Sequence, residues 1–215
     1  PLSFTGDLIL FAYLFGLARF FTVAAALDTG SAFEGMGAAR EVTFSCLAEP
    51  ALFLALLALT RISGSLNLTE ILHGPLTASF SAVSAPLVLV AIGLFLVFLA
   101  ENCRIPVDDP NTHLELTMIH EVMVLDHSGP LFGLVLYGAS VKLFVLGAVL
   151  LHTVTTVTAC DPRWDWPIFV GLMLGLAALT GVVESVMARL QMRHVPYMLV
   201  AAVLFCGFGF ILLVR

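Results

Sequence analysis

The sequence predicts an all-α membrane protein with about six transmembrane helices. Hydrophobic residues make up 60% of its 215 positions and charged residues only 11%, whereas a soluble domain has about 25% charged residues. The mean hydropathy of +1.06 comes from apolar runs of about 20 residues, the length that crosses a bilayer. The chain cannot bury so much apolar surface within itself, so we expect lipid to surround it.

Glycine and proline separate the apolar runs, as at Gly74-Pro75 and Gly129-Pro130. Trp166 begins the fifth run, where the aromatic residues of an interfacial belt are common. We expect one membrane domain, residues 1–215. Its predicted spans are 7–27, 42–60, 84–102, 131–152, 166–188 and 196–214.

The connection 103–130 is the longest and predicts an amphipathic helix at the membrane interface. Asn111 is a suitable cap for a helix over 111–126. Apolar residues at 114, 118, 122 and 125 recur at helical spacing and form one face. His113, His120 and His127 form another face, which we expect to be solvated; a pH-sensitive or partner-docking row is the alternative.

Most acidic residues belong to one face of the membrane, which holds the connections 28–41, 103–130 and 189–195. Eleven of the 15 acids lie in these connections or toward the same ends of the spans: Asp28, Glu34, Glu41, Glu49, Glu101, Asp108, Asp109, Glu115, Glu121, Asp126 and Glu184. The arginines on this side are Arg19, Arg40, Arg104, Arg189 and Arg193. Arginine near short loops marks the cytoplasmic side, so we expect this face in the cytoplasm.

Five charged residues fall inside or at the ends of the spans: Arg19, Glu49, Glu101, Lys142 and Glu184. A charge at the bilayer centre costs at least about 2.5–3.5 kcal/mol, so each one needs a reason. Glu49 and Lys142 are too deep to reach water easily, and we expect a hydrated or paired site for them. For Glu101 we expect snorkelling to the interface, with a site in the funnel as the alternative, and for Glu184 both interpretations stay open. Together the five predict a polar funnel in which a Lys142–carboxylate pair relays protons.

Several other chemistries are excluded. The four cysteines form no CxxC pair, so no iron–sulfur or zinc pattern is present, and we expect them to pack as small residues. His120-Glu121 begins a zinc-protease motif, but Val124 occupies the position of the second histidine. The net charge of −6 argues against binding nucleic acid. Any redox cofactor is therefore expected on a partner and none in this chain.

Three blocks of sequence carry a resemblance to a known family. They are Leu27–Glu41 with Glu49-Pro50, then Ile105–Pro110 continuing through Leu114–Leu116 to Asp126–Gly129, and finally Glu184–Leu190. These blocks resemble the superfamily of subunit 1 of complex I (NADH-quinone oxidoreductase), in particular its hydrogenase branch, that of the formate hydrogenlyase and hydrogenase-4 membrane subunits. The resemblance covers nearly the whole chain.

The resemblance implies a site at the cytoplasmic surface. In the family, cytoplasmic loops hold a hydrogenase-like large subunit and an iron–sulfur subunit, and an acidic path leads to antiporter-like membrane subunits. Arg40 and Glu49 match a pair near the quinone chamber of complex I, and Asp108 and Glu115 match acids of its acidic loop. From the funnel and the resemblance together, we expect a path through Glu49, Glu101, Asp108, Glu115, Glu184 and Lys142. The expected docking or funnel residues are Arg19, Asp28, Arg40, Glu41, Arg104, Asp109, His120, Glu121 and Arg189.

The sequence also departs from complex I. Complex I has two further glutamates after the second proline of the loop, where this chain has Asn111 and His113, and the loop here is about three residues longer. These differences favour the hydrogenase branch. Because the family usually has eight spans, we expect two more before Pro1.

These features predict a non-catalytic membrane subunit of an energy-converting redox complex, in a bacterial or archaeal cytoplasmic membrane. We expect the large subunit and iron–sulfur subunit to carry iron–sulfur clusters and a nickel–iron centre. One alternative is a quinone-cavity subunit of NADH-quinone oxidoreductase. Others are a stand-alone ion transporter and a purely structural anchor.

Overall fold

A computed structural model describes residues 4–73, 80–108, 118–154 and 162–214, and every regular element in these ranges is helical. In chain order the elements are α1 (Asp7–Asp28), α2 (Ala32–Ser63), α3 (Leu68–His73), α4 (Phe80–Glu101), the 3-10 turn η1 (Glu121–Val124), α5 (Gly129–Val154), α6 (Pro162–Val186), the 3-10 turn η2 (Met192–His194) and α7 (Val195–Val214). The predicted all-α membrane fold is confirmed. Five helices, namely α1, α2, α5, α6 and α7, are long and apolar enough to cross a membrane, and Ala85–Glu101 of α4 is a shorter apolar helix.

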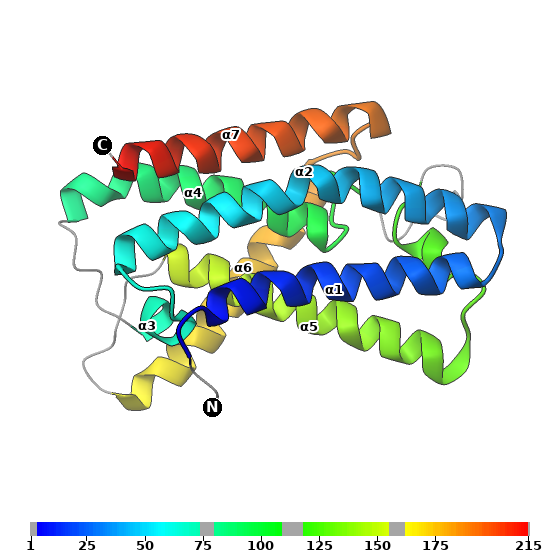
Figure 1. Ribbon diagram of the computed structural model, residues 1–215, viewed down its shortest axis with the longest axis horizontal. Coiled ribbons are helices and arrows are strands. Elements are labelled where there is room, and N and C mark those ends of the chain that lie inside the picture. Colours follow the sequence, from blue (N-terminus) through cyan, green and yellow to red (C-terminus); the bar gives the residue numbers. More distant parts are fainter. Residues whose placement is uncertain (1–3, 74–79, 109–117, 155–161, 215) are drawn as a thin grey trace.

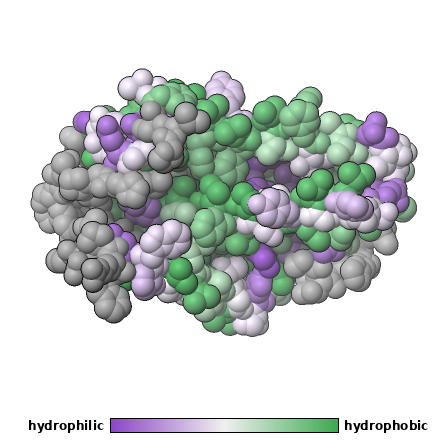
Figure 2. Space-filling view, turned by 90° about the horizontal axis from the view of Figure 1, so that it is seen from below, coloured by the Kyte–Doolittle hydropathy of each residue, from purple (hydrophilic) through white to green (hydrophobic). Residues whose placement is uncertain are grey.

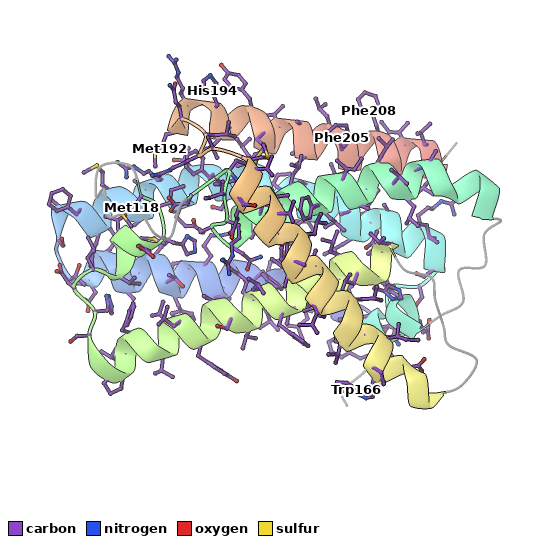
Figure 3. The ribbon with its side chains drawn as sticks, turned by 180° about the vertical axis from the view of Figure 1, so that it is seen from behind. Met118, Trp166, Met192, His194, Phe205 and Phe208 are labelled. Atoms are coloured by element: carbon purple, nitrogen blue, oxygen red, sulfur yellow. The ribbon has the colours of Figure 1, made fainter. Side chains whose placement is uncertain are left out.

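The helices form a bundle with α2 near its centre (Figure 1). Helix α7 packs along α4 and α2, and α1 runs beside α2 on the other side. Helix α6 crosses α5 obliquely and, among the described elements, has its main contact there (Figure 3). Trp166 lies at the outer end of α6, whereas Met118, Met192 and His194 lie toward the opposite end of the molecule. We call that opposite end, with residues 29–31, 102–108, 118–128 and 187–194, the loop end.

Two glycines allow α4 and α7 to approach closely. A Cβ added at Gly93 would lie 2.4 Å from the Cys206 sulfur, and one added at Gly209 would lie 2.9 Å from the Pro86 carbonyl oxygen. Small residues at such positions let membrane helices gain van der Waals contact, since the apolar lipid provides no hydrophobic drive between them. The α4–α7 pair thus forms the tightly packed part of the bundle.

The surface of α1 and α6 is largely apolar. Most of their side chains are exposed, including Tyr13, Phe20, Leu174 and Val182. Hydrophobic side chains cover much of the coloured face in Figure 2, and hydrophilic ones lie at its right end, at its left end and at a few places between them. This distribution suits helices that face lipid or other membrane proteins.

Helix α2 differs from the prediction, because it begins at Ala32 and not at residue 42. The stretch 32–41 was predicted as a connection on account of its glycines and charges. Gly37 instead fits against the turn η1, where an added Cβ would lie 2.3 Å from the Val122 side chain. At 1.5 Å per residue the 32-residue helix is about 48 Å long, against about 30 Å of hydrocarbon. The helix is therefore long enough to extend beyond the apolar layer.

The predicted interfacial helix 111–126 was also wrong in its described part. Residues 111–117 lie outside the described ranges, and over 118–126 the only helical element is the turn η1. Met118 and Val122 are buried, as the apolar pattern indicated, but Leu125 is exposed. His120 and His127 do not form a solvated face, since each lies beside a carboxylate of α2.

Candidate functional site

Arg19 joins carboxylates from two other helices inside the bundle. Its Nε lies 3.3 Å from Glu41 Oε1, and its two terminal nitrogens pair with Glu49 of α2 and Glu101 of α4. The side chains of Arg19 and Glu41 are each 11% exposed. Arg19 lies nine residues before the end of α1 at Asp28, or about 14 Å along the helix. Only an arginine presents enough donors in a planar fork to hold three carboxylates at once.

Lys142 extends this cluster to a fourth helix. Its Nζ lies 3.6 Å from Glu101 Oε2, an oxygen that is buried and accepts no hydrogen bond from any described residue. The predicted lysine–carboxylate pair is thus present, with Glu101 as the carboxylate. We call Arg19, Glu41, Glu49, Glu101 and Lys142 the ion-pair network. It holds three carboxylates and two cations, so it can take up one proton without gaining net positive charge.

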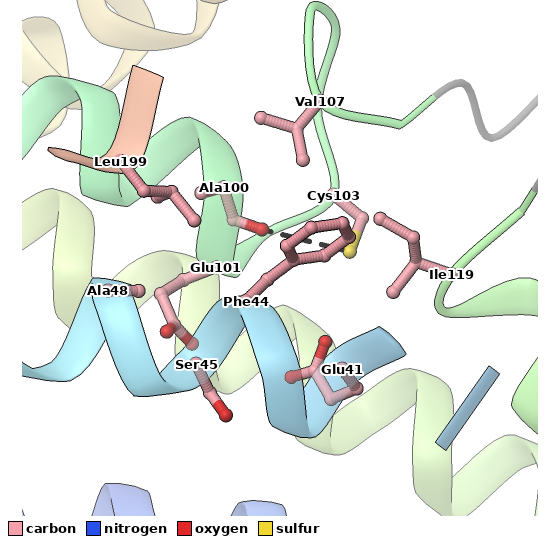
Figure 4. A pocket seen from close by; sticks show the side chains of 10 residues that line it. All are labelled: Glu41, Phe44, Ser45, Ala48, Ala100, Glu101, Cys103, Val107, Ile119 and Leu199. Atoms are coloured by element: carbon pink, nitrogen blue, oxygen red, sulfur yellow. Dashed lines mark hydrogen bonds between the residues drawn. The ribbon is translucent and has the colours of Figure 1, made fainter. Parts of the chain in front are cut away.

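A small cavity adjoins the ion-pair network (Figure 4). Glu41 and Glu101 contribute their carboxylates from α2 and from the end of α4. The remaining lining residues are mostly apolar: Phe44, Ser45, Ala48, Ala100, Cys103, Val107, Ile119 and Leu199. The cavity offers about 20 Å³ to the centre of a water molecule, which is room for about one water. Small-molecule sites are usually several hundred Å³.

Cys103 and His120 meet at the edge of this cavity. The Cys103 sulfur lies 2.8 Å from His120 Nδ1, which in turn lies 3.4 Å from Glu41 Oε2. Burial lowers the pKa of His120 below its ordinary value, although Glu41 acts in the opposite direction. Burial, reinforced by Glu41, raises the pKa of the Cys103 thiol well above its ordinary value. Both side chains are therefore neutral near pH 7.

Asp108 fastens the loops that surround the site. Its Oδ2 accepts the backbone N–H of Ile119 at 2.9 Å and that of His120 at 3.4 Å, while Oδ1 pairs with Arg189 at 2.9 Å. Its side chain is 4% exposed. Nearby, Arg104 lies 3.5 Å from Glu184. These contacts tie residues 102–108 to the end of α6 and to the loop after it.

A second buried carboxylate, Glu34, was not predicted as a site residue. Its side chain is fully buried and accepts the Asp126 N–H at 2.8 Å, together with the Thr29 hydroxyl. His127 Nδ1 lies 3.7 Å from it. Arg40 donates to the Met118 carbonyl at 2.7 Å. Glu34 and Arg40 thus attach the start of α2 to residues 118–127.

Comparisons with known proteins agree with this architecture. The whole chain, residues 1–215, matches the NADH dehydrogenase family. The chain belongs to that family, whose members resemble complex I subunit 1. The predicted family resemblance is confirmed.

Two curated relatives fall in the hydrogenase branch of the NADH dehydrogenase family. Formate hydrogenlyase subunit 4 of Escherichia coli K12 is 31% identical over 220 aligned positions, which cover 98% of this chain and 67% of the relative. Hydrogenase-4 component C of the same organism is 37% identical over 149 positions, or 69% of this chain and 46% of the relative. The chain thus spans about half to two thirds of these relatives.

Within this family member, the structure brings together some predicted residues and separates others. Arg19, Glu41, Glu49, Glu101 and Lys142 form the ion-pair network, although the Glu49 side chain is 44% exposed and less enclosed than predicted. Glu184 and Asp108 pair elsewhere, with Arg104 and Arg189. Asp28 is exposed, and Glu121 is half-buried at η1. Asp109 and Glu115 lie outside the described residues.

The sequence prediction missed Cys103, which it treated as a packing residue. A lone cysteine has no motif around it, and its contact with His120 comes from two separate loops. Among the residues that the structure describes, no group of three His, Cys, Asp or Glu side chains is placed to hold a metal ion.

Proposed function

We propose that the chain is a non-catalytic membrane subunit of an energy-converting redox complex of the hydrogenase or formate hydrogenlyase type. In this proposal it anchors a hydrogenase-like arm and couples electron transfer in that arm to the translocation of protons or other ions. The relatives support the type of complex, because one is a subunit of formate hydrogenlyase and the other a component of hydrogenase-4. The ion-pair network is the observation that carries the coupling role.

The network supports ion coupling because a simple anchor has no need of it. Charges within membrane helices are costly and usually mark ion or proton pathways. Here four helices or helix ends contribute ionisable groups that touch in sequence from Glu41 through Arg19 and Glu101 to Lys142. A change in the charge or position of one group alters the energies of the others at these distances. In the proposal, an electrostatic change at the loop end thereby reaches Lys142.

The other charged residues have supporting roles in this proposal. Asp108 has both carboxylate oxygens engaged, so we assign it to positioning the loops and not to proton transfer. The arm would dock on the part of the loop end at Glu121 and on Asp28 and Arg40 beside it. The predicted orientation places this end in the cytoplasm of a bacterium or archaeon and the helices in its cytoplasmic membrane.

The proposed partners are a hydrogenase-like large subunit, an iron–sulfur subunit and antiporter-like membrane subunits. They would carry the iron–sulfur clusters and the nickel–iron centre, and electrons would not pass through this chain. The exposed apolar faces of α1 and α6 support contact with lipid or neighbouring membrane subunits.

The test is Glu101→Gln in the assembled complex, reconstituted in vesicles. Glutamine keeps the size of the side chain but cannot ionise, so we expect redox turnover to continue while proton translocation falls strongly. Glu70→Gln is the matched control, because Glu70 is exposed on α3, outside the loop end and the network. Full translocation in the Glu101→Gln complex would contradict the proposal.

The family match also supports a second candidate, the quinone-cavity subunit of an NADH-quinone oxidoreductase. The cavity beside Glu101 has room for about one water, so that cavity is not itself a quinone site. Reduction of a quinone by the purified complex, blocked by a quinone-site inhibitor, would decide for the second candidate.

A further inference from the structure

Three polar side chains from separate segments meet between the loops and the ion-pair network. They are Cys103, just after α4; His120, just before η1; and Glu41, on α2. The distances are 2.8 Å from the Cys103 sulfur to His120 Nδ1 and 3.4 Å from Nδ1 to Glu41 Oε2. Glu41 Oε1 in turn lies 3.3 Å from Arg19 Nε. His120 thus contacts the ion-pair network directly, through Glu41.

His120 is also the member of the trio that can exchange protons near neutral pH. An imidazole has two nitrogens, so it can gain a proton on one and lose a proton from the other. Its side chain is 26% exposed, compared with 11% for Glu41. His120 therefore lies between the partly exposed loops and the enclosed carboxylates.

Cys103 is held beside His120 at some conformational cost. Its φ of 50° lies in the left-handed region, which a residue with a Cβ rarely adopts. The turn itself ends α4, since Arg104 N–H donates to the Leu99 carbonyl and Cys103 N–H to that of Ala100. Glycine is the usual residue at this position of such a turn. A cysteine here directs its sulfur to the imidazole, and such outliers often mark functional positions.

We propose that His120 is the proton-relay residue between the loop end and the ion-pair network, with Cys103 as its positioning residue. This inference rests on the proposed function. A proton bound at Nε2 gives the imidazolium, and the proton on Nδ1 then passes to Glu41 Oε2. The imidazole is left neutral with its proton on Nε2, and rotation of the ring or exchange with water returns it to the starting tautomer. Cys103 keeps its own proton throughout, and its sulfur fixes the ring beside Glu41 as a weak acceptor of Nδ1–H.

The charges around His120 allow this step. Glu41 on α2, Glu101 at the end of α4 and Asp108 in the loop all favour the imidazolium, whereas Lys142 on α5 opposes it. Burial also opposes it and is the largest influence on the imidazole. The imidazolium can therefore form during proton transfer, while the neutral imidazole is the resting form, as a relay requires.

The experiment compares His120→Gln with His127→Gln in the assembled complex. His127 lies in the same loop beside a different carboxylate, Glu34, which is outside the network. A positioned proton-transfer group contributes roughly 100-fold or more, so we expect proton translocation in His120→Gln to fall by about 100-fold. Redox turnover should be retained, and His127→Gln should translocate normally.

Two further measurements exclude a merely structural role. Added imidazole should restore translocation to a His120→Ala complex in proportion to its concentration. Cys103→Ser, whose hydroxyl oxygen can still accept from Nδ1–H, should translocate better than Cys103→Ala. Absence of imidazole rescue, with equal activity of the two Cys103 variants, would overturn the relay.

The outcome for Glu101→Gln separates the two proposals. Loss of translocation in Glu101→Gln together with wild-type translocation and pH profile in His120→Gln would overturn the relay alone. Normal translocation in both variants would overturn the proposed function as well. Loss in both, with imidazole rescue of His120→Ala, is the expected result.

Discussion

Arg19 holds three carboxylates, so its replacement leaves more buried negative charge than any other single change in the network. Removing one partner of a buried ion pair typically costs about 3–5 kcal/mol. We expect Arg19→Gln to lower the free energy of unfolding of the protein in detergent by an amount of this order. The variant should therefore unfold at a lower temperature. Arg193→Gln, at an exposed arginine of the loop end, is the control and should change stability little. Equal unfolding temperatures for the two variants would show that the pairs contribute nothing to folding.

His120 gives a pH dependence whose sign follows from its lowered pKa. The folded protein binds the His120 proton less well than the unfolded chain, whose histidine pKa is about 6.5. The contribution to stability is therefore complete above about pH 6.5 and is lost as the pH falls below it. Between pH 7.5 and 5.5, wild-type protein should lose more stability than His120→Gln. Parallel pH profiles would mean that His120 titrates normally in the folded state.

Cys103 provides a chemical check at the same place. Because burial raises the pKa of its thiol, little thiolate is present at neutral pH, and the thiolate is the reactive form. We expect a maleimide to label Cys103 at pH 7 much more slowly in the folded protein than in the protein unfolded by denaturant. Mass spectrometry of the labelled peptides measures both rates, and rapid labelling of Cys103 would contradict the enclosed site.

Sequence could predict single residues of the network but not their partners. Arg19, Glu101 and Lys142 stand out because a charge within an apolar run is costly. The contacts of Arg19 with Glu41, Glu49 and Glu101 depend on how α1, α2 and α4 rotate and pack, and one sequence does not contain that information. The contact between Cys103 and His120 could not be predicted for the same reason.

At the scale of the elements, the α4–α7 pair depends on Gly93. An added methyl group would lie 2.4 Å from the Cys206 sulfur and 3.0 Å from the Ala202 carbonyl oxygen. We expect Gly93→Ala to destabilise the protein by about 1–3 kcal/mol, the usual cost of overpacking. Gly175→Ala on α6 is the matched control, since nothing lies within 4 Å of its added Cβ. A Gly93→Ala protein as stable as the control would mean that these helices separate easily.

The apolar runs could be recognised in the sequence because their length and hydropathy depend only on local sequence. The start of α2 was missed because Gly35, Gly37 and the nearby charges are typical of a loop. In the structure this segment stays helical because Gly37 and Ala38 pack into the turn η1 and the end of α1, and buried Glu34 binds the loop. Tertiary contacts thus override the local pattern.

At the scale of the whole molecule, the loop end and the ion-pair network are linked by short contacts. Asp108 ties the loops together, His120 touches Glu41, and Arg19 connects Glu41 to Glu101. The opposite flanks, α1 and α6, bury few of their own side chains and are suited to lipid or membrane partners. In the proposed function, this arrangement would transmit an effect from a docked arm to neighbouring membrane subunits.

The most direct test of this coupling is a double-mutant cycle on Glu101 and Lys142 in the assembled complex. Proton translocation per electron pair would be measured for the wild type, Glu101→Gln, Lys142→Met and the double variant. If the two residues act as one pair, the double variant should lose no more translocation than the more affected single variant. Independent, multiplicative losses, or full translocation in the double variant, would contradict the account.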